Sequence, residues 1–408
     1  MISAFDAQSK YRSLERPRVI VMSNNPIGLG IIRNLQGYGL ELLCLVQKVN
    51  FVCSSRYLSN VIDIDIDIEK EPDRLLRVLI NKGEQLPEKG FILPTSEIEL
   101  MFLATNRGVL SEYYLLSLSK EKVVSIIVDK YLLHQELLKL SFNSPHTLLL
   151  DSINSIDKIR NEISYPCLLK PVFSGDWKTD RSYSVMGVQK AIVIHNEQDL
   201  VASYNLVSSI SPKVLLQEIV QADEHGTYSF CCYADKSGKV LWGFVTQKIL
   251  QYPKNFGTAL LCQTVVEPEI SDLGKRVVEA LGIDGISEVE IMTDKKSGLL
   301  YVIEINIRHW LQHTQSTRLG VNISLLDYYY RTGKMDETNR VLSMASQNAK
   351  PVMWIDDFGY LFHCIKNYFS FNSCKFNLFK GKHWEFAVFS LKDFSPFFSL
   401  LRGKIKGI

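Results

Sequence analysis

The sequence predicts an α/β protein whose amino-terminal part is a doubly wound parallel sheet. The apolar run Val19–Met22 is followed by a glycine-containing turn, a helical segment at Ile31–Gln36 and a second apolar run at Leu40–Val46. These elements form one strand–helix–strand unit with short connections, which is how a parallel sheet begins. Hydrophobic residues make up 46% of the 408 residues, enough for two to three domains with buried cores.

The composition argues against several other classes of protein. Charged residues at 22% and a net charge of +2 are ordinary globular values, which disfavours a disordered chain, a coiled coil or a generally basic nucleic-acid binder. No apolar run reaches the ~18 residues of a membrane helix, and the first 18 residues lack the apolar centre of a secretory signal. The eight cysteines show no C-x-x-C spacing, and the scattered histidines supply no zinc cluster. We therefore expect a cytoplasmic protein with free, mostly buried thiols.

Gly28 and Gly30 follow the first strand and could cradle the pyrophosphate of a dinucleotide. The full fingerprint requires a third glycine, but position 33 is arginine, and no acidic residue ends the second strand. A nicotinamide-dependent dehydrogenase built on this turn is therefore the weaker interpretation. A need for small residues in the turn is the simpler one.

The next elements continue the same alternation of strands and helices. Val61–Ile68 alternates aspartate with apolar residues, which predicts a half-exposed strand; a calcium site on its aspartates is a weaker alternative. Glu71–Lys82 is typical of a helix, and Gly90–Pro94 of a buried strand. Because ligands bind at the carboxyl ends of strands in open α/β sheets, Thr95 and Glu97 are candidate substrate residues.

From about Val123 the pattern changes to short strands separated by helices and polar stretches. The expected strands are Tyr165–Pro171, Val188–Ile194, Val214–Val220, Tyr228–Ala234, Val240–Gln247, Leu260–Val266, Ser287–Thr293 and Leu300–Asn306. The expected helical segments are Asp129–Leu140, one that starts at Glu197, Ile270–Leu281 and most of Arg308–Tyr330. No period of roughly 20 to 50 residues recurs, which argues against a repeat protein.

Two lysines lie where an ammonium group needs an anionic partner. Lys170 lies at the end of an otherwise apolar strand, directly before Pro171, and a buried ammonium is unfavourable unless it is paired. Lys130 begins a helix about 40 residues earlier. Taken singly, each is more typical of a structural salt bridge than of a phosphate ligand.

The acidic residues near position 300 form a more specific pattern. Glu304 and Asn306 lie two residues apart and therefore on one face of a strand. Glu290 lies on the preceding strand of a hairpin expected around Asp294–Gly298, so the three side chains would form an all-oxygen patch. Mg²⁺ prefers such ligands, usually together with substrate phosphates, and Arg308 follows within reach. An exposed, charged strand face is the alternative, but the interleaved apolar residues favour a half-buried strand.

The sequence resembles the ATP-grasp superfamily of carboxylate–amine ligases over roughly residues 19 to 335. The motifs that carry this resemblance are Asp129-Lys130, Tyr165–Pro171, Leu216–Val220, Glu288–Asp294 and Glu304–Trp310. Within the superfamily, the D-aspartate ligase-like group is the most similar, through Asn306-x-Arg308-x-Trp310, Gly320–Asn322 and Gln247–Pro253. Ile307 and Gln312 depart from the family pattern, and both departures bear on substrate specificity rather than on the nucleotide site.

The resemblance implies an ATP-grasp fold preceded by a Rossmann-like domain. The implied domains are a Rossmann-like pre-ATP-grasp domain at 1–120, a small lobe with a phosphate-covering loop at 121–210, a large lobe with the metal and catalytic residues at 211–335, and an aromatic, basic extension at 336–408.

The resemblance also implies roles for individual residues. The ATP-binding set is Lys130, Lys170, Ser174, Gly175, Lys190, Glu218, Val220, Glu224 and Lys248, with Ser174–Gly187 as a mobile loop over the triphosphate. The ligands of two Mg²⁺ ions are Glu290, Glu304 and Asn306. The substrate side would include Thr95, Glu97, Trp310, His313, Arg318 and Asn322, each of which has a plausible structural role as well.

The implied activity is an ADP-forming ligation that uses ATP and Mg²⁺. The γ-phosphoryl group passes to a carboxylate while Lys170 neutralises its charge, and an amine, expected to be an amino acid, attacks the acyl phosphate with Arg308 stabilising the oxyanion. The carboxylate would belong to a small molecule, a glycan or a precursor, with no nucleic-acid partner; a homodimer is left open. A nucleotide-binding relative without catalysis is the alternative, which the intact set of motif residues disfavours.

The carboxy-terminal segment has an unusual composition. Residues 360–408 hold eight lysines and arginines against two acidic residues, a net charge of +6, and thirteen aromatic residues. Basic and aromatic residues together suit the interface of an anionic membrane, which would place the protein at its inner face. Packing of the aromatic residues against the ligase body, with solvated lysines outside, is the alternative.

Overall fold

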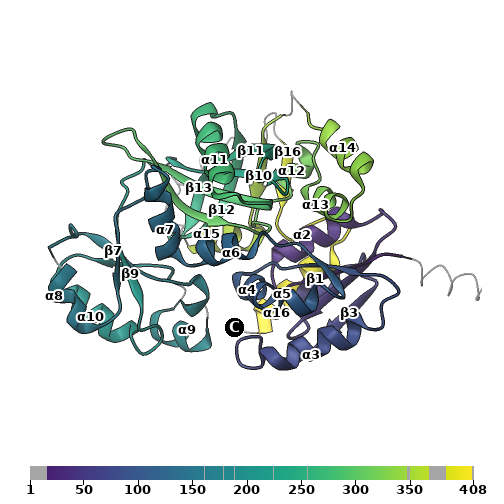
Figure 1. The fold of residues 1–408 in the computed structure, drawn as a ribbon, viewed down its shortest axis with the longest axis horizontal. Helices are drawn as coiled ribbons and strands as arrows, with labels where there is room; N and C mark the ends of the chain where they lie inside the picture. The colour runs from purple at the N-terminus through teal and green to yellow at the C-terminus, as the bar shows by residue number, and fades with distance from the viewer. Residues whose placement is uncertain are drawn as a thin grey trace, which may run out of the picture. The chain divides into compact units, whose positions relative to one another are not determined.

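The computed structural model describes residues 16–406 apart from 160, 178, 188, 224, 255, 347–349 and 367–382 (Figure 1). Its contacts divide the chain into two compact units, and each is described by itself. Unit 1 comprises residues 1–119, 308–357 and 377–408, and unit 2 comprises 120–307 and 358–376. Within the described part of the chain, no helix is both long enough and apolar enough to span a bilayer.

Unit 1 contains a five-stranded sheet in the order β3-β2-β1-β4-β5. Its strands are β1 (Arg18–Met22), β2 (Glu41–Val46), β3 (Asn60–Asp63), β4 (Gly90–Leu93) and β5 (Tyr114–Leu116), and every neighbouring pair is parallel. The chain builds outward from β1 first through β2 and then through β4, which confirms the doubly wound topology. The junction between β1 and β4 is the topological switch point, where ligands bind in such sheets.

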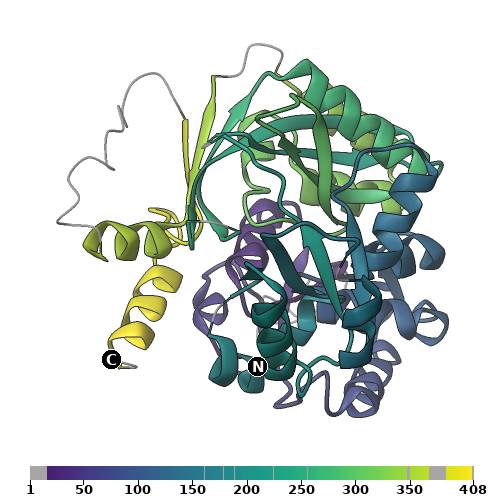
Figure 2. The same ribbon diagram turned by 90° about the vertical axis from the view of Figure 1, so that its left-hand side faces the viewer.

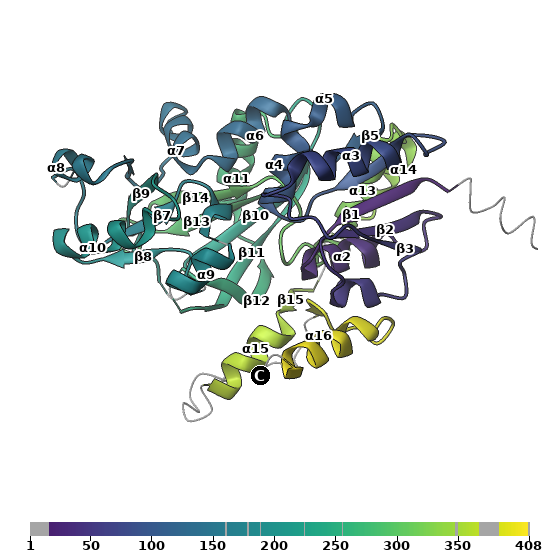
Figure 3. The same ribbon diagram turned by 90° about the horizontal axis from the view of Figure 1, so that it is seen from below.

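Helices cover both faces of this sheet. Figure 3 shows α3 (Pro72–Gly83) and α4 (Glu97–Thr105) on one side and α2 (Pro26–Leu35) on the other. Asn25 caps α2, and Ser96 forms a capping box with Glu99 at the start of α4. The remaining helices of the unit are η1 (Phe51–Ser54), α5 (Arg107–Leu110), α12 (Gln315–Arg318), α13 (Ile323–Arg331), α14 (Met335–Ser343) and α16 (Ser395–Lys406). A parallel strand pair, β15 (Val352–Ile355) and β16 (His383–Phe386), completes it.

Unit 2 contains a smaller and a larger sheet. The smaller is antiparallel, in the order β6 (Thr147–Leu150), β9 (Val214–Glu218), β7 (Cys167–Pro171) and β8 (Ile192–Ile194). Its buried core includes Leu169, Trp177, Leu200 and Leu216. The associated helices are α8 (Ile156–Ile159), η3 (Ser174–Trp177), α9 (Asp180–Met186) and α10 (Glu197–Val207), after η2 (Ile153–Ser155).

The larger sheet of unit 2 pairs five antiparallel strands. In order they are β14 (Leu300–Asn306), β13 (Gly285–Thr293), β10 (Thr227–Ala234), β11 (Val240–Tyr252) and β12 (Thr258–Val265). The unit's other helices are α6 (Glu121–Val128), α7 (Lys130–Lys139), α11 (Pro268–Leu281) and α15 (Asp357–Lys366). Gly274 of α11 lies so close to Phe230 of β10 that a Cβ atom there would lie 2.3 Å from the Phe230 Cβ atom, so glycine is needed for this contact.

Some sequence-based expectations differ from the structure. The strand predicted over Val61–Ile68 ends at Asp63, because the chain turns at Asp65 with φ 44° while Ile64 and Ile66 stay buried. The helix after the first strand begins at Pro26 rather than Ile31, since the Asn-Pro start supplies a cap and a first helical residue.

The two units are defined by contacts and are coarser than the four expected domains, which stay a prediction. The first segment of unit 1 ends at Ser119, and residues 308–357 group with it. The stretch predicted to be mainly helical begins with a non-helical segment and holds only α12 and α13. Its buried side chains pack into unit 1, which explains why the segment groups there.

The amino-terminal glycines are explained by packing. A Cβ atom at Gly28 would lie 2.1 Å from Ser23 Oγ, and one at Gly30 would lie 2.6 Å from His313 Cε1. Both distances are far below van der Waals contact, and His313 is fully buried. The Gly-x-Gly spacing therefore lets α2 approach β1 and the 308–318 segment, without any need for a dinucleotide.

We expect Gly30→Ala to lower the free energy of unfolding by about 1–3 kcal/mol, because the new methyl group has no space beside the His313 ring. Gly108→Ala is the matched control, since nothing lies within 4 Å of its Cβ position. Thermal midpoints of the two variants should move apart, with the control unchanged or slightly more stable. Equal midpoints would contradict the packing explanation.

Candidate active site

The predicted acidic residues lie opposite one another on the β13–β14 hairpin. Glu290 is the register partner of Glu304, and Glu288 is the partner of Asn306. The Asn306 amide donates a hydrogen bond of 3.0 Å to the Glu288 carboxylate, which is buried. Glu288 was not predicted as a site residue, although its place two positions before Glu290 puts it on the same strand face.

Each of the two opposed carboxylates contacts a lysine from another element. Lys130 Nζ lies 3.1 Å from Glu304 Oε1, and Lys248 Nζ lies 3.4 Å from Glu290 Oε2. Lys130 also donates a hydrogen bond to the Ser174 hydroxyl. Asp129 orients this lysine by capping α7, since its carboxylate accepts the Tyr131 and Leu132 amides. The structure thus brings the first predicted lysine to the predicted metal patch.

Lys170 is held at the end of β7 by a side chain that the sequence analysis did not select. Its ammonium donates a 2.7 Å hydrogen bond to Gln217 Oε1, and Gln217 Nε2 donates to Thr147 Oγ1 at 2.9 Å. Gln217 is buried and fixes the direction of the lysine across the small sheet. Its signal in the sequence is a single amide between the apolar run Val214–Leu216 and Glu218.

The charges at this place shift one another's pKa values. Burial lowers the pKa of Lys170 to about 8, with nearby Lys130 acting in the same direction and the Glu304 carboxylate opposing both. The Lys130 ammonium holds the pKa of Glu304 well below its usual range despite burial, and Lys190 and Lys170 add to the effect. Burial opposes the charge of Lys248, but the nearby acidic groups, Glu290 first among them, together raise its pKa. Lysines from separate elements therefore surround an acidic strand pair.

The other predicted nucleotide residues lie on or near the smaller sheet of unit 2. Ser174 and the buried Gly175 start η3, so the expected covering loop contains two short helices, η3 and α9. Glu218 ends β9 and accepts a 2.9 Å hydrogen bond from the His146 amide. Val220 is buried and Lys190 is exposed. Glu224 lies outside the described residues.

The substrate candidates of unit 1 fall into two groups, and the first lies at the switch point of its sheet. Asn25 Nδ2 after β1 donates a 3.0 Å hydrogen bond to Thr95 Oγ1 after β4. The buried Glu99 accepts the Thr95 and Ser96 amides at 2.7 and 2.9 Å, and burial raises its pKa. Glu97 is the first residue of α4.

The second group is buried in unit 1. Trp310 and His313 have ring centroids 6.5 Å apart, and burial lowers the pKa of His313 to about 4. Asn322 caps α13 by accepting the Leu325 amide and donates to the Asn34 carbonyl oxygen at 2.6 Å. Arg308 donates to the His309 carbonyl oxygen. These contacts explain the residues structurally, and their substrate roles stay predictions.

The oxygen donors suit a cation that arrives together with phosphates. Among the described residues, no group of three or more histidine, cysteine, aspartate or glutamate side chains could hold a metal by itself. Glu290, Glu304 and Asn306 offer two carboxylates and an amide, and Mg²⁺ at nucleotide sites is commonly bound by one or two carboxylates plus phosphate oxygens. The residues present therefore fit Mg²⁺ as part of a nucleotide complex.

Comparison with known proteins supports this assignment of the fold. No family model matches the sequence. A D-alanine–D-alanine ligase from Polynucleobacter asymbioticus is 22% identical over 252 residues, which are 58% of this chain. The chain spans 66% of that relative's length, and 43% of the length of two further D-alanine–D-alanine ligases.

Two solved structures share the architecture. The biotin carboxylase domain of 2-oxoglutarate carboxylase from Hydrogenobacter thermophilus, solved with MgADP and bicarbonate, superimposes with a TM-score of 0.60 at 20% identity. The match covers 78% of this chain and 69% of that one. An L-amino acid ligase from Bacillus licheniformis gives a TM-score of 0.59 at 15% identity and covers 77% and 73%. These matches confirm the predicted ATP-grasp fold.

Lys170 should give the stability of the free protein a distinct pH dependence. Its pKa of about 8 lies below the ordinary 10.5, so its charge destabilises the folded state at low pH and this penalty vanishes as pH rises from 8 to 10.5. Relative to Lys170→Met, wild type should therefore gain unfolding free energy over that range, measured by urea denaturation.

Lys248→Met is the matched control for the pH series. The raised pKa of Lys248 means that its stabilising contribution is fully present below the ordinary lysine pKa, so the deficit of this variant should stay constant up to about pH 10. A constant difference between wild type and Lys170→Met would contradict the burial of the Lys170 charge.

Proposed function

We propose that the protein is an ATP-dependent, ADP-forming ligase that joins a carboxylate to an amine through an acyl phosphate. The observation that carries the proposal is the placement of Lys130 and Lys170 beside the opposed carboxylates Glu290 and Glu304. A γ-phosphoryl transfer needs positive charge around the phosphates and oxygen ligands for Mg²⁺, and the site supplies both.

The lysines and the small lobe would bind the nucleotide. Lys130 and Lys170 hold the phosphates, Ser174 and Gly175 approach them from η3, and Lys190 adds positive charge. Adenine lies against the hinge at Glu218 and Val220, with Glu224 at the ribose. Lys248 contributes a further cation beside the site, where its ammonium lies 3.4 Å from the Glu290 carboxylate.

The acidic hairpin would hold Mg²⁺ through Glu290, Glu304 and Asn306. The bound metal supplies charge neutralisation on the transferring phosphoryl group. Glu288 fixes the Asn306 amide by accepting its N–H, which leaves the amide oxygen available as a ligand. This support explains why a buried glutamate lies next to the predicted ligands.

The acyl phosphate is then attacked by the amine, and Arg308 stabilises the oxyanion that forms at the acyl carbon. Water must be excluded at this stage, because an acyl phosphate hydrolyses readily. Closure of the Ser174–Gly187 segment over the triphosphate would provide this exclusion. The products are an amide, ADP and phosphate.

We infer that an amino acid is one substrate and that the D-aspartate ligase-like group is the relevant one. The Asn306-x-Arg308-x-Trp310 motif supports the group, and two similar proteins are a D-alanine–D-alanine ligase and an L-amino acid ligase. Thr95 and Glu97 at the switch point are the proposed acceptor side, together with Trp310, His313 and Asn322. A homodimer is part of the proposal, since the similar biotin carboxylase domain is a dimer.

The two alternatives have less support. A relative without catalysis would have no need of Glu290, Glu304, Asn306 and Arg308 together. A nicotinamide-dependent dehydrogenase would need Gly28 and Gly30 for its cofactor, but close packing already accounts for both glycines.

Glu304→Gln should lower magnesium-dependent ADP release at least about 100-fold, because the variant loses a charged oxygen ligand at the transferring phosphate. The assay supplies ATP, Mg²⁺ and D- or L-amino acids singly and in pairs. Glu269→Gln, on the exposed start of α11, is the control and should keep full activity. Wild-type turnover by Glu304→Gln with an unchanged circular dichroism spectrum would refute the metal assignment.

If an acyl phosphate forms, one carboxylate oxygen of the acid should end up in the released phosphate. With the acid that supports ADP release labelled with oxygen-18 in its carboxylate, one labelled oxygen should appear in each released phosphate, detected by mass spectrometry. The label transfers because the bridging oxygen leaves with the phosphoryl group when the amine attacks. Label in AMP, with pyrophosphate as the second product, would show adenylation instead and refute the proposed mechanism.

A further inference from the structure

A buried carboxylate clamps the carboxy-terminal helix α16 onto unit 1. The Asp393 side chain is 0% exposed and accepts hydrogen bonds from Arg33 Nε at 3.0 Å, Ser55 Oγ at 2.8 Å and the Arg56 amide at 3.0 Å. Arg33 also donates to the Asp393 carbonyl oxygen at 2.7 Å. These hydrogen bonds satisfy the buried carboxylate and hold the segment against η1 and α2. The side chains next to Asp393 are therefore exposed in the folded protein itself.

The aromatic residues of this segment divide into an inner and an outer set. Phe389 and Phe397 pack against each other at 5.4 Å and are partly or largely covered. Phe394 and Phe398, four residues apart, are 54% and 49% exposed, and Leu391 is 84% exposed. Packing against the body of the protein therefore explains only the inner set. Clustered exposed apolar side chains of this kind mark an interaction surface.

Cations border the outer aromatic set. Arg402 follows Phe398 by one helical turn and is exposed, as are Lys392 and Arg56. The two acidic residues of the segment 383–406 are already paired, Glu385 with Arg318 and Asp393 with Arg33. We call Leu391, Lys392, Phe394, Phe398 and Arg402 the outer face; its net charge is positive.

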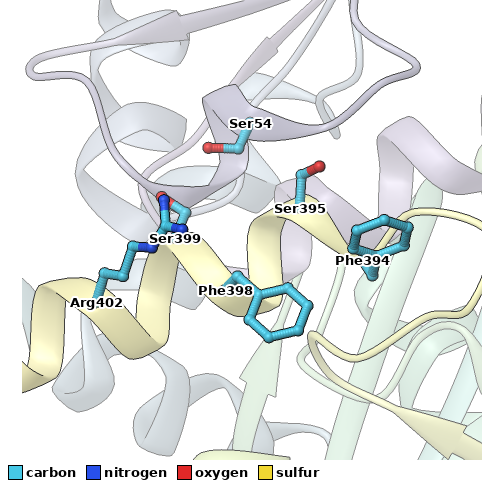
Figure 4. A pocket seen from close by; sticks show the side chains of 6 residues that line it. All are labelled: Ser54, Phe394, Ser395, Phe398, Ser399 and Arg402. Carbon is cyan, nitrogen blue, oxygen red and sulfur yellow. The ribbon is translucent and has the colours of Figure 1, made fainter.

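A cavity of about 380 Å³ opens along the outer face. Figure 4 shows its lining, with Ser395 and Ser399 of α16 toward Ser54 of η1, the rings of Phe394 and Phe398 at one end and Arg402 at the other. Three hydroxyl groups and a guanidinium thus lie next to two phenyl rings. This combination matches a group that has phosphate oxygens at one end and apolar carbons at the other.

We propose that the outer face docks the protein onto the surface of an anionic lipid bilayer. Phe394 and Phe398 enter the interface at headgroup depth, and Arg402 binds lipid phosphates. The helix that carries Phe398 and Arg402 is α16, which is yellow in Figures 2 and 3. Each basic residue near an anionic surface strengthens binding about fivefold.

The positive charge of the outer face favours an anionic lipid surface over other binding partners. A second copy of the same face would bring two positively charged surfaces together, and like charges across an interface repel. A neutral apolar partner would leave the cations without counter-charges. Anionic headgroups satisfy both the rings and the cations, and this argument is independent of the proposed ligase activity.

Vesicle flotation of the full-length protein tests the proposal. We expect binding to vesicles of phosphatidylglycerol and phosphatidylcholine at low salt, weak binding to pure phosphatidylcholine, and loss of binding at high salt. Phe394→Ser with Phe398→Ser should weaken binding at least about tenfold, because two rings no longer leave water. Arg402→Glu should weaken it by more than about fivefold.

Matched controls separate this surface from general charge and apolarity. Tyr38→Ser removes an exposed ring and Arg77→Glu reverses an exposed charge elsewhere in unit 1, and both should bind like wild type. Thermal midpoints establish that all variants are folded. Absence of binding to phosphatidylglycerol vesicles at low salt, or equal losses in the controls, would overturn the proposal. So would a dimer, seen by analytical ultracentrifugation, that the Phe394 and Phe398 substitutions dissolve.

Discussion

Two carboxylates face each other across β13 and β14, and other elements of unit 2 supply the lysines that compensate their negative charge. Like charges directly opposite in a sheet are destabilising. Lys130 from the start of α7 contacts Glu304, and Lys248 from β11 contacts Glu290, so each carboxylate has a counter-ion. The start of α7 and the middle of β11 are therefore tied to the same strand pair.

The need to compensate these two carboxylates also bears on the smaller sheet of unit 2. Lys170 on β7 is partly buried, the same carboxylates act on its charge, and Gln217 holds its ammonium in place. In the proposed function the ion pairs change partners. The ATP phosphates would bind the lysines, and Mg²⁺ would bind the carboxylates.

Unit 1 uses buried charge for a different purpose. Asp393 is paired with Arg33 and Asp327 with Arg331 and Ser117, all within the unit. In both cases the carboxylate joins segments that are distant in the sequence. Residues such as Asn322 and His313 likewise have structural partners, which shows that a polar residue near a motif can serve the core. The outer face is different, because its side chains remain exposed although Asp393 ties this segment to Arg33.

The sequence alone determined the α/β class, the doubly wound sheet and the strands of the acidic hairpin. These depend on local periodicity, and the two-residue alternation around Glu304 already placed Asn306 on the same face. Tertiary structure alone decided the rest. Gln217 and Glu288 support the site across neighbouring strands, Gly30 is required by a histidine 283 positions away, and Asp393 is buried by Arg33. Such contacts depend on the register and packing of segments distant in the chain, which no local pattern specifies.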